Sequence, residues 1–327
     1  MKKIIVTTAM VLFAYSVSAA SVNVALDTDP DRENSGTYRY ADNLIQLLKK
    51  KGWQAHAFPR DTIGGEDERL DRVRSGTLDI SLSRYTSAAE LVPEMQVLQL
   101  PYTFESSDHQ YNFFVESNYL DDVNKRLASE GLRVLAVIPT GGFLGLFNSE
   151  KPIKTVSDMA GLRMRALDQN QLNMFEMMGA SGVIIPLSEV SNAFKTGIAD
   201  GYINASSVPL MFGQTDLLHY FTDAKVIMSA RLALASQYWW DNLSVDEQRQ
   251  FTALSIEAQK DVFDWVSLSE TVHKQSLMAA GIEVYEPTEE DLSTFKSALS
   301  GMNQYVKGVS PDRVLQLQDM VSDYLPQ

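Results

Sequence analysis

The sequence predicts an α/β protein built from two lobes. The chain has 327 residues, which leaves room for two domains of roughly 150 residues each. Short apolar strand patterns alternate with helical patterns along it, and one helix–strand unit occurs twice. A long helical tract in the last third exceeds the size of one lobe, so it could brace both.

The chain begins with two strand patterns on either side of a helix. Residues 22–26 and residues 54–58 are the predicted strands. Between them Tyr40, Leu44 and Leu48 share one face of a helical pattern, and Gly52 ends it. These elements predict the start of the first lobe.

The first copy of the repeated unit follows at once. Gly64-Gly65 opens a helix whose first turn is acidic, which suits the positive end of the helix dipole. Gly76 ends this helix. Residues 78–83 then alternate apolar and polar, which predicts a half-buried strand.

The second copy begins at residues 187–189, where Ser188 is the predicted N-cap. The helix of this copy ends at Gly197, and a strand over residues 198–204 follows. Ser83 and Asn204 each lie seven residues beyond the glycine of their unit, near the carboxyl end of a strand. In open α/β sheets ligands bind outside these strand ends. Each lobe is therefore expected to offer one polar residue to a shared cleft.

Two capping patterns mark further helices. Thr155-x-x-Asp158 starts one before a strand at residues 162–167. Ser244-x-x-Glu247 is a capping box that begins the long tract, which runs over residues 245–280 up to Gly281. Residues 289–324 are expected to be mostly helical.

The first twenty residues have the pattern of a secretory signal. Lys2 and Lys3 precede an apolar stretch at residues 4–15, and small residues at 18–20 suit cleavage before Ala20 or Ser21. A membrane anchor is the alternative, but the stretch is short and weakly apolar for a bilayer. We therefore expect export to the periplasm, with residues 1–20 removed.

Composition narrows the function classes. The formal charge is −14, and nucleic-acid binding is disfavoured because phosphate backbones need a basic surface. An anionic ligand would need a local positive site against this field. The absence of cysteine excludes thiol catalysis and thiolate metal sites, and it means that the fold is expected to hold without disulfides.

Catalytic and metal motifs are absent or incomplete. Asp27-x-Asp29-x-Asp31 imitates a calcium loop, but Arg32 and Tyr38 stand where glycine and glutamate are needed. This segment could still lie beside the cleft, because it follows the first strand. The four histidines have no metal-ligand spacing, and no nucleophile motif or phosphate-binding loop occurs. We expect neither an enzyme nor a cofactor.

Several stretches, in order and spacing, resemble the solute-binding subunits of TRAP (tripartite ATP-independent periplasmic) transporters of the dicarboxylate-binding type. They span most of the chain after the signal. The stretches are Ile63-Gly64-Gly65-Glu66-Asp67-Glu68, Ser75-Gly76-Thr77-Leu78-Asp79, Val92-Pro93-Glu94, Leu100-Pro101-Tyr102-Thr103-Phe104, Lys151-Pro152-Ile153, Gly161-Leu162-Arg163-Met164-Arg165, Pro186-Leu187-Ser188-Glu189, Gly197 and Asp200-Gly201.

The resemblance implies a two-lobed fold like that of periplasmic binding proteins, with crossing strands and a long bracing helix. It assigns residues 21–141 and about 230–269 to lobe I, and residues 142–229 and about 270–327 to lobe II. The chain would act as a monomer that captures a small organic acid and hands it to a membrane permease driven by sodium.

Arg165 matches the arginine that pairs with the ligand carboxylate in this family, and Asn204 matches a polar ligand contact. The residues themselves agree for Arg165, since an inward charge in an apolar strand pattern is expensive. A guanidinium also fits a carboxylate with two parallel hydrogen bonds. The alternative is that Arg165 faces solvent or pairs with Asp168 or Glu189.

One position departs from the family pattern. Leu144 stands where many relatives carry a second basic residue, so the ligand would have fewer charged anchors or a more apolar body. Arg84 could compensate, or it could be a solvated strand-end residue. Glu66 could line the cleft, or act only on the helix dipole. The full set of expected ligand-binding residues is Arg165, Asn204, Ser83, Arg84, Phe143, Leu187 and Glu66.

Three functions remain open at this point. The leading hypothesis is capture of an organic acid, a carboxylate or possibly a sulfonate, for a TRAP-type transporter. A second is a binding subunit that presents the same kind of solute to a membrane sensor. A periplasmic enzyme is the third, and the missing catalytic triad disfavours it.

Overall fold

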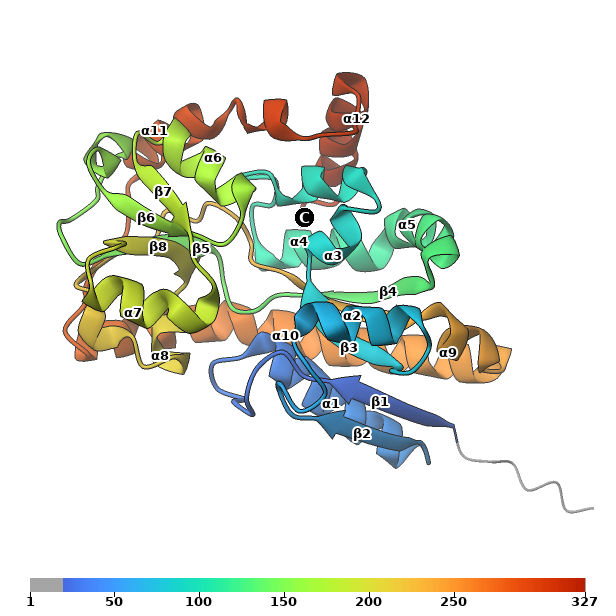
Figure 1. Ribbon diagram of the computed structural model, residues 1–327. Coiled ribbons are helices and arrows are strands. Elements are labelled where there is room, and N and C mark those ends of the chain that lie inside the picture. The colour runs from blue at the N-terminus through green and yellow to red at the C-terminus, as the bar shows by residue number, and fades with distance from the viewer. Residues whose placement is uncertain (1–19, 327) are drawn as a thin grey trace, which may run out of the picture.

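The computed structural model describes residues 20–326, and the N-terminal segment expected to be a signal lies outside this range except for Ala20. The chain forms two lobes, each built around its own sheet (Figure 1). The five-stranded sheet, of order β2-β1-β3-β10-β4, defines lobe I, and the six-stranded sheet, of order β11-β9-β5-β8-β6-β7, defines lobe II. This confirms the predicted two-lobed α/β fold.

The sheet of lobe I is parallel except for one strand. β1 pairs in parallel with β2 and β3, and β10 is inserted antiparallel between β3 and β4. The carboxyl end of β3 and the start of β10 therefore meet at the same edge, where Arg84 lies opposite Arg231. The strands are β1 (Ser21–Ala25), β2 (Gln54–Phe58), β3 (Ile80–Arg84), β4 (Leu132–Ile138) and β10 (Arg231–Ser236).

The strand predicted in the first repeated unit is present, but the prediction that it is half buried is wrong. β3 is buried on both faces, because Ser81 and Ser83 are as fully covered as Ile80 and Leu82. It is the central strand of its sheet, and helices pack on both sides. The helices of this lobe are α1 (Gly36–Lys50), α2 (Glu66–Arg74), α3 (Thr86–Ala89), η1 (Pro93–Gln99), α4 (Ser107–Glu116), α5 (Tyr119–Leu127), η2 (Ala128–Glu130) and α9 (Gln237–Asn242).

Lobe II carries the second copy of the unit. Its β8 lies between β5, which is antiparallel to it, and β6, which is parallel. The strands are β5 (Leu144–Asn148), β6 (Arg163–Ala166), β7 (Ser181–Ile184), β8 (Gly201–Ala205), β9 (Tyr220–Thr222) and β11 (Glu283–Tyr285). The helices are η3 (Val156–Met159), α6 (Gln169–Met177), η4 (Leu187–Glu189), α7 (Val190–Lys195), α8 (Val208–Met211), η5 (Thr215–Leu217) and α11 (Glu289–Leu299).

The predicted cap of this second copy is wrong. A turn of 3₁₀ helix, η4, precedes α7, so the N-cap of α7 is Glu189 and no side chain caps it. Ser188 lies inside η4 and is exposed. The capping pattern at Thr155 and Asp158 is confirmed, because both side chains make the reciprocal hydrogen bonds with the backbone.

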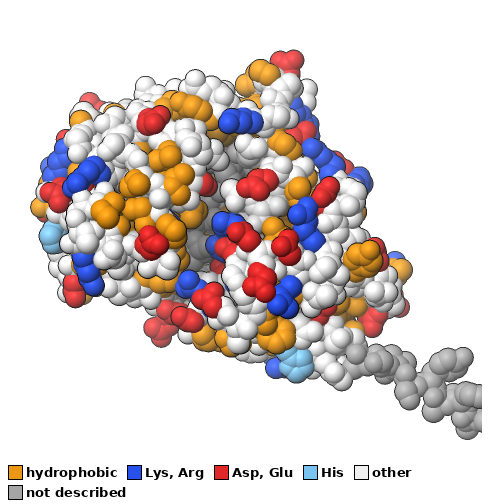
Figure 2. Space-filling view, viewed as in Figure 1, with side chains coloured by type: hydrophobic (Ala, Val, Ile, Leu, Met, Phe, Trp, Pro, Cys, Tyr) orange, Lys and Arg blue, Asp and Glu red, His pale blue; other side chains and the backbone are white. Residues whose placement is uncertain are grey.

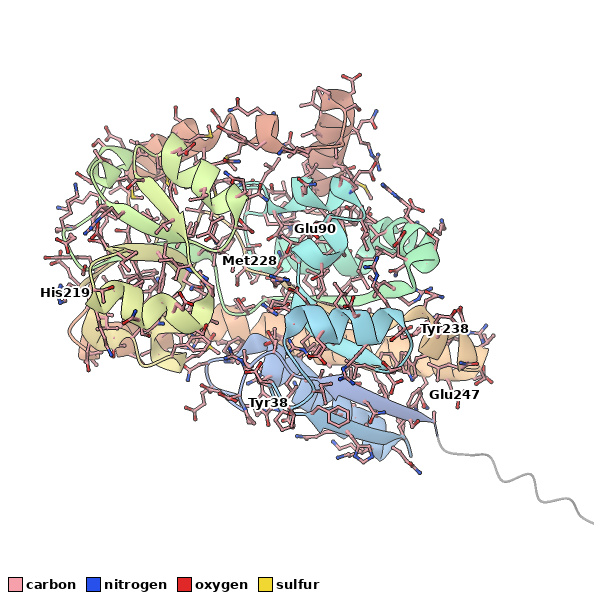
Figure 3. All side chains as sticks on the ribbon, viewed as in Figure 1. Tyr38, Glu90, His219, Met228, Tyr238 and Glu247 are labelled. Carbon is pink, nitrogen blue, oxygen red and sulfur yellow. The ribbon has the colours of Figure 1, made fainter. Side chains whose placement is uncertain are left out.

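Two short chain segments and one long helix cross between the lobes, and the chain crosses once more after α11. Residues 139–143 link β4 to β5 and residues 223–230 link β9 to β10, and Phe143 and Met228 form an antiparallel bridge where the two segments meet. Met228 lies between the lobes, and Glu247 lies far out at the end of lobe I (Figure 3). Glu247 completes the capping box of α10 (Val245–Ala279). This helix contacts α1, α4 and β4 of lobe I and α8 and β11 of lobe II, as expected for a brace.

The last helix corrects the expected lobe boundaries. Residues 270–327 were all assigned to lobe II, but α12 (Pro311–Ser322) packs on η1 of lobe I. Arg313 Nε lies 3.0 Å from Glu94 Oε1, and His109 Nε2 lies 2.8 Å from the carbonyl oxygen of Val321. The chain therefore returns to lobe I through η6 (Met302–Tyr305). Among residues 20–326, none of the helices combines the length and the apolar composition that a membrane span requires.

Candidate ligand-binding site

A cavity of about 280 Å³ lies between the two lobes, and the space-filling view shows the hollow from one side (Figure 2). Most of its wall is apolar, with a few charged and amide side chains, which is typical of a small-molecule site. Side chains from both lobes and from η6 contribute. The apolar part includes Leu100, Leu144, Met174, Leu187, Ile203, Val208, Met211, Phe212, Ile227 and Met302.

Arg165 enters the cavity from lobe II. It lies in β6, whose alternate residues Met164 and Ala166 are buried in the hydrophobic core, so the arginine occupies the other face. Only 3% of the residue is exposed. Its Nε donates to the carbonyl oxygen of Ile185 at 2.8 Å, while its buried Nη2 has no hydrogen-bond partner among the described residues. Burial lowers the pKa of this guanidinium, although Tyr202 and Asp168 act in the opposite direction.

The two alternatives raised for Arg165 do not describe the structure. It does not face solvent, and within residues 20–326 it makes no ion pair, either with Asp168 or with Glu189. Arg163, two residues earlier on the same strand, shows the contrasting case. It is half exposed, and its Nε lies 3.1 Å from Asp200 Oδ2.

Asn204, Leu187 and Asp168 are among the other lobe II residues that line the cavity. Asn204 of β8 does so as expected, and its Oδ1 accepts a hydrogen bond from its neighbour's backbone N–H at 3.1 Å. Leu187, at the start of η4, also lines it. Asp168 is a lining residue that is already used, because it caps α6 and accepts from the backbone N–H of Gln171 at 3.0 Å.

The lobe I wall carries two arginines that have carboxylate partners. Arg231 Nε lies 2.6 Å from Asp27 Oδ2, and its Nη2 lies 2.7 Å from Glu66 Oε1. Burial would lower the pKa of Arg231, but these two carboxylates outweigh that effect and raise the pKa. Arg84 pairs with the exposed Asp67, and its Nε lies 3.7 Å from Glu66 Oε2. We call Asp27, Glu66, Asp67, Arg84 and Arg231 the lobe I charge cluster.

Three of the expected site residues do not line the cavity. Ser83 hydrogen-bonds Ser81 Oγ at 3.1 Å beneath α2, because its side chain is on the face of β3 away from the cavity. Phe143 lies in the crossing segment, where its backbone N–H donates to Glu270 at 2.9 Å and its ring packs on the core. Glu66 lies behind Arg231 and also accepts the backbone N–H of Arg84.

Sequence reasoning missed Arg231 altogether. It is the first residue of an apolar strand, and its partner Glu66 is 165 residues away along the chain. A lone charge at the edge of an apolar run was the available signal. Asp27, by contrast, lines the cavity, and the position after the first strand had indicated that it could. Other lining residues that were missed are Thr28, Ser35, Thr37, Thr140, Asn170, Gln171 and Ser229.

Metal binding finds no support in this site. Across residues 20–326 no group of three or more His, Asp or Glu side chains is arranged to hold a metal ion. The polar groups that face the cavity are guanidinium, amide and hydroxyl groups together with two carboxylates. Such a set can orient an anion and hydrogen-bond its substituents.

Known proteins of similar sequence include two periplasmic binding proteins. The 2,3-diketo-L-gulonate-binding periplasmic protein YiaO of Escherichia coli is 25% identical over 298 residues, 90% of this chain and 89% of that protein. The C4-dicarboxylate-binding periplasmic protein DctP of Vibrio cholerae is 23% identical over 79% of this chain and 77% of its own length.

A solved structure has the same fold. The TRAP periplasmic solute-binding protein of Chromohalobacter salexigens, crystallised with D-glucuronate, superposes with a TM-score of 0.81 at 20% identity, covering 93% of this chain and 99% of the other. The family model for bacterial extracellular solute-binding proteins, family 7, matches residues 32–307. The resemblance seen in the sequence is thereby confirmed, and the chain belongs to this family of solute-binding proteins.

Proposed function

We propose that the chain captures a small organic acid in the cavity between its lobes and delivers it to a TRAP-type membrane permease. The observation that carries the proposal is Arg165, a buried guanidinium that lines the cavity and has no carboxylate partner in the described protein. A charge held in this way is costly unless a ligand completes it. The ligand carboxylate would supply two parallel hydrogen bonds.

Capture would occur by closure of the lobes. The two crossing segments meet at Phe143 and Met228, so they can act as a hinge between the sheets. Closure would remove water from around Arg165 and the bound carboxylate, and their attraction would strengthen in the lower dielectric. Asn204, Leu187 and Arg84 would contact the rest of the ligand, and no chemical step is involved.

The relatives suggest the class of ligand. A diketogulonate, a C4-dicarboxylate and a glucuronate appear in the names of the proteins compared above, and each carries at least one carboxylate. We infer that this chain also takes a carboxylate in the periplasm, as a monomer, after removal of residues 1–20. Mass spectrometry of the chain recovered from the periplasm should find the new N-terminus at Ala20 or Ser21.

A thermal-shift screen over small carboxylates and sulfonates tests the binding step. A ligand that binds only the native state stabilises it and so raises the melting temperature. At a ligand concentration of a hundred times the dissociation constant, the stabilisation is about 2.7 kcal/mol. We expect at least one acid to do so in the wild type and to lose the effect in Arg165→Ala. If no acid shifts the wild type, or if Arg165→Ala responds equally, the proposal fails.

Deletion of the gene tests the delivery step. Uptake of the acid found in the screen should fall when this chain is absent and return when it is restored. Unchanged uptake together with a lost transcriptional response to the acid would assign the binding to a membrane sensor instead.

A further inference from the structure

Among the described residues, the cavity has one cation without a carboxylate partner, and this limits the charge of its ligand. Three arginines line it within the described chain, namely Arg84, Arg165 and Arg231. Arg84 and Arg231 already face carboxylates, whereas Arg165 faces none. One carboxylate on the ligand would therefore be neutralised, and a second would find no unpaired partner.

The lobe I wall, opposite Arg165, would repel a second carboxylate on the ligand. In the lobe I charge cluster two guanidinium groups face three carboxylates, so the cluster has an excess of one negative charge. Asp27 is the carboxylate of this cluster that lines the cavity, and only 3% of its side chain is exposed. Its Oδ2 is paired with Arg231, while its buried Oδ1 has no hydrogen-bond partner among the described residues. A buried acceptor without a donor is costly.

The middle of the cavity adds no cation. Leu144 of β5 lines it where a basic residue would provide a second anchor, together with Ile203 of the neighbouring strand β8. A charged group placed against such a surface would lose its water without gaining a partner.

We propose that the ligand is a monocarboxylate whose carboxylate meets Arg165 and whose far end presents a hydrogen-bond donor, a hydroxyl or an ammonium group, to Asp27. This inference rests on the proposed function and restricts it, because C4-dicarboxylates and other diacids are then poor ligands. Asp27 acts as a specificity residue: it accepts from a donor and repels a second carboxylate.

Matched pairs of acids test the inference by calorimetry. In each pair the two acids have the same number of carbons, and the terminal hydroxymethyl group of the monoacid is a second carboxylate in the diacid: gluconate against glucarate, 6-hydroxyhexanoate against adipate, and 4-hydroxybutyrate against succinate. 6-Aminohexanoate is included to separate ammonium from hydroxyl recognition. In every pair that binds, the donor-bearing monoacid should bind at least ten-fold more tightly. A diacid that binds as tightly as its partner overturns the inference.

Asp27→Asn provides the second arm, because the amide keeps the size of the side chain and removes its charge. The preference for the monoacid should fall at least ten-fold, while Asp29→Asn, a change at an exposed position in the same segment, should leave it unchanged. Equal preference in Asp27→Asn and wild type would overturn the role of Asp27. If diacids bind the wild type as tightly as the monoacids and lose binding in Arg165→Ala, only this inference is contradicted, because Arg165 still holds an acid. If no acid binds the wild type, the proposed function itself is contradicted.

Discussion

The two walls of the cavity use the same residue type in opposite ways. On lobe I, Arg231 lies between Asp27 and Glu66 and belongs to a set of charges that neutralise one another within the protein. On lobe II, Arg165 is more deeply enclosed, with 3% of the residue exposed against 22% of the Arg231 side chain, and its only hydrogen-bond partner among the described residues is a backbone carbonyl. The lobe I arginine therefore contributes to the frame of the site, and the lobe II arginine is left for a ligand. The presence or absence of a carboxylate partner distinguishes these roles.

The largest expected effect is on ligand affinity. Arg165→Ala should weaken binding of the best acid from the screen by about 3–5 kcal/mol, roughly 150- to 4,000-fold, because the ligand carboxylate would be buried without a partner. Isothermal titration calorimetry measures the loss. Arg163→Ala is the matched control, since its side chain pairs with Asp200 and does not line the cavity. Equal losses in the two variants would remove the distinction between the two arginines.

The next effect is on stability and distinguishes the two walls. Arg231→Met should lower the free energy of unfolding by about 3 kcal/mol, because Asp27 and Glu66 lose the cation that they share. Arg165→Met should change it by less than about 1 kcal/mol, since the lost hydrogen bond to Ile185 is offset by the removal of an unpaired buried charge. Urea denaturation of both variants gives the comparison, and a larger loss in Arg165→Met would reverse the assigned roles.

A smaller effect should follow when a cation is added to the lobe II wall. Leu144→Arg places a second guanidinium beside the cavity, so it should improve binding of glucarate relative to gluconate by about ten-fold, or 1.4 kcal/mol. The measurement is the ratio of the two dissociation constants. An unchanged ratio would show that the charge count of the cavity does not set its selectivity.

The smallest expected effect is on the pH dependence of stability, and it concerns Glu270, which contacts the crossing segment at Phe143. Burial raises the pKa of Glu270, whose carboxylate accepts the backbone N–H of Phe143. The folded state thus holds this proton more tightly than the unfolded state, and the resulting stability is lost as pH rises from about 4.5 through the raised pKa. In Glu270→Gln that loss disappears, so the stability of the variant relative to wild type should increase with pH. Glu257→Gln, exposed on the same helix, should show no such trend.

Features set by local sequence were predicted well. The capping box at Ser244, the capping pattern at Thr155 and the glycine that ends each unit are short-range signals, and the structure has all of them. Arg165 was also predicted to point inward, because a charge in an apolar strand pattern needs a reason to be there.

Features set by distant contacts were not predicted. Alternation along β3 could not show that both faces are covered, so Ser83 was expected at the cavity although it lies beneath α2. The contact of Arg231 with Glu66 joins segments 165 residues apart, and no local pattern specifies it. The position of α12 depends in the same way on its contacts with η1 of lobe I.

The most direct measurement is a crystal structure of the protein with the acid that gives the largest thermal shift. We expect the lobes to enclose the acid and its carboxylate oxygens to lie about 2.7–2.9 Å from the guanidinium nitrogens of Arg165. A carboxylate bound instead to Arg84 or Arg231, or an acid bound outside the cavity, would contradict the central role of Arg165.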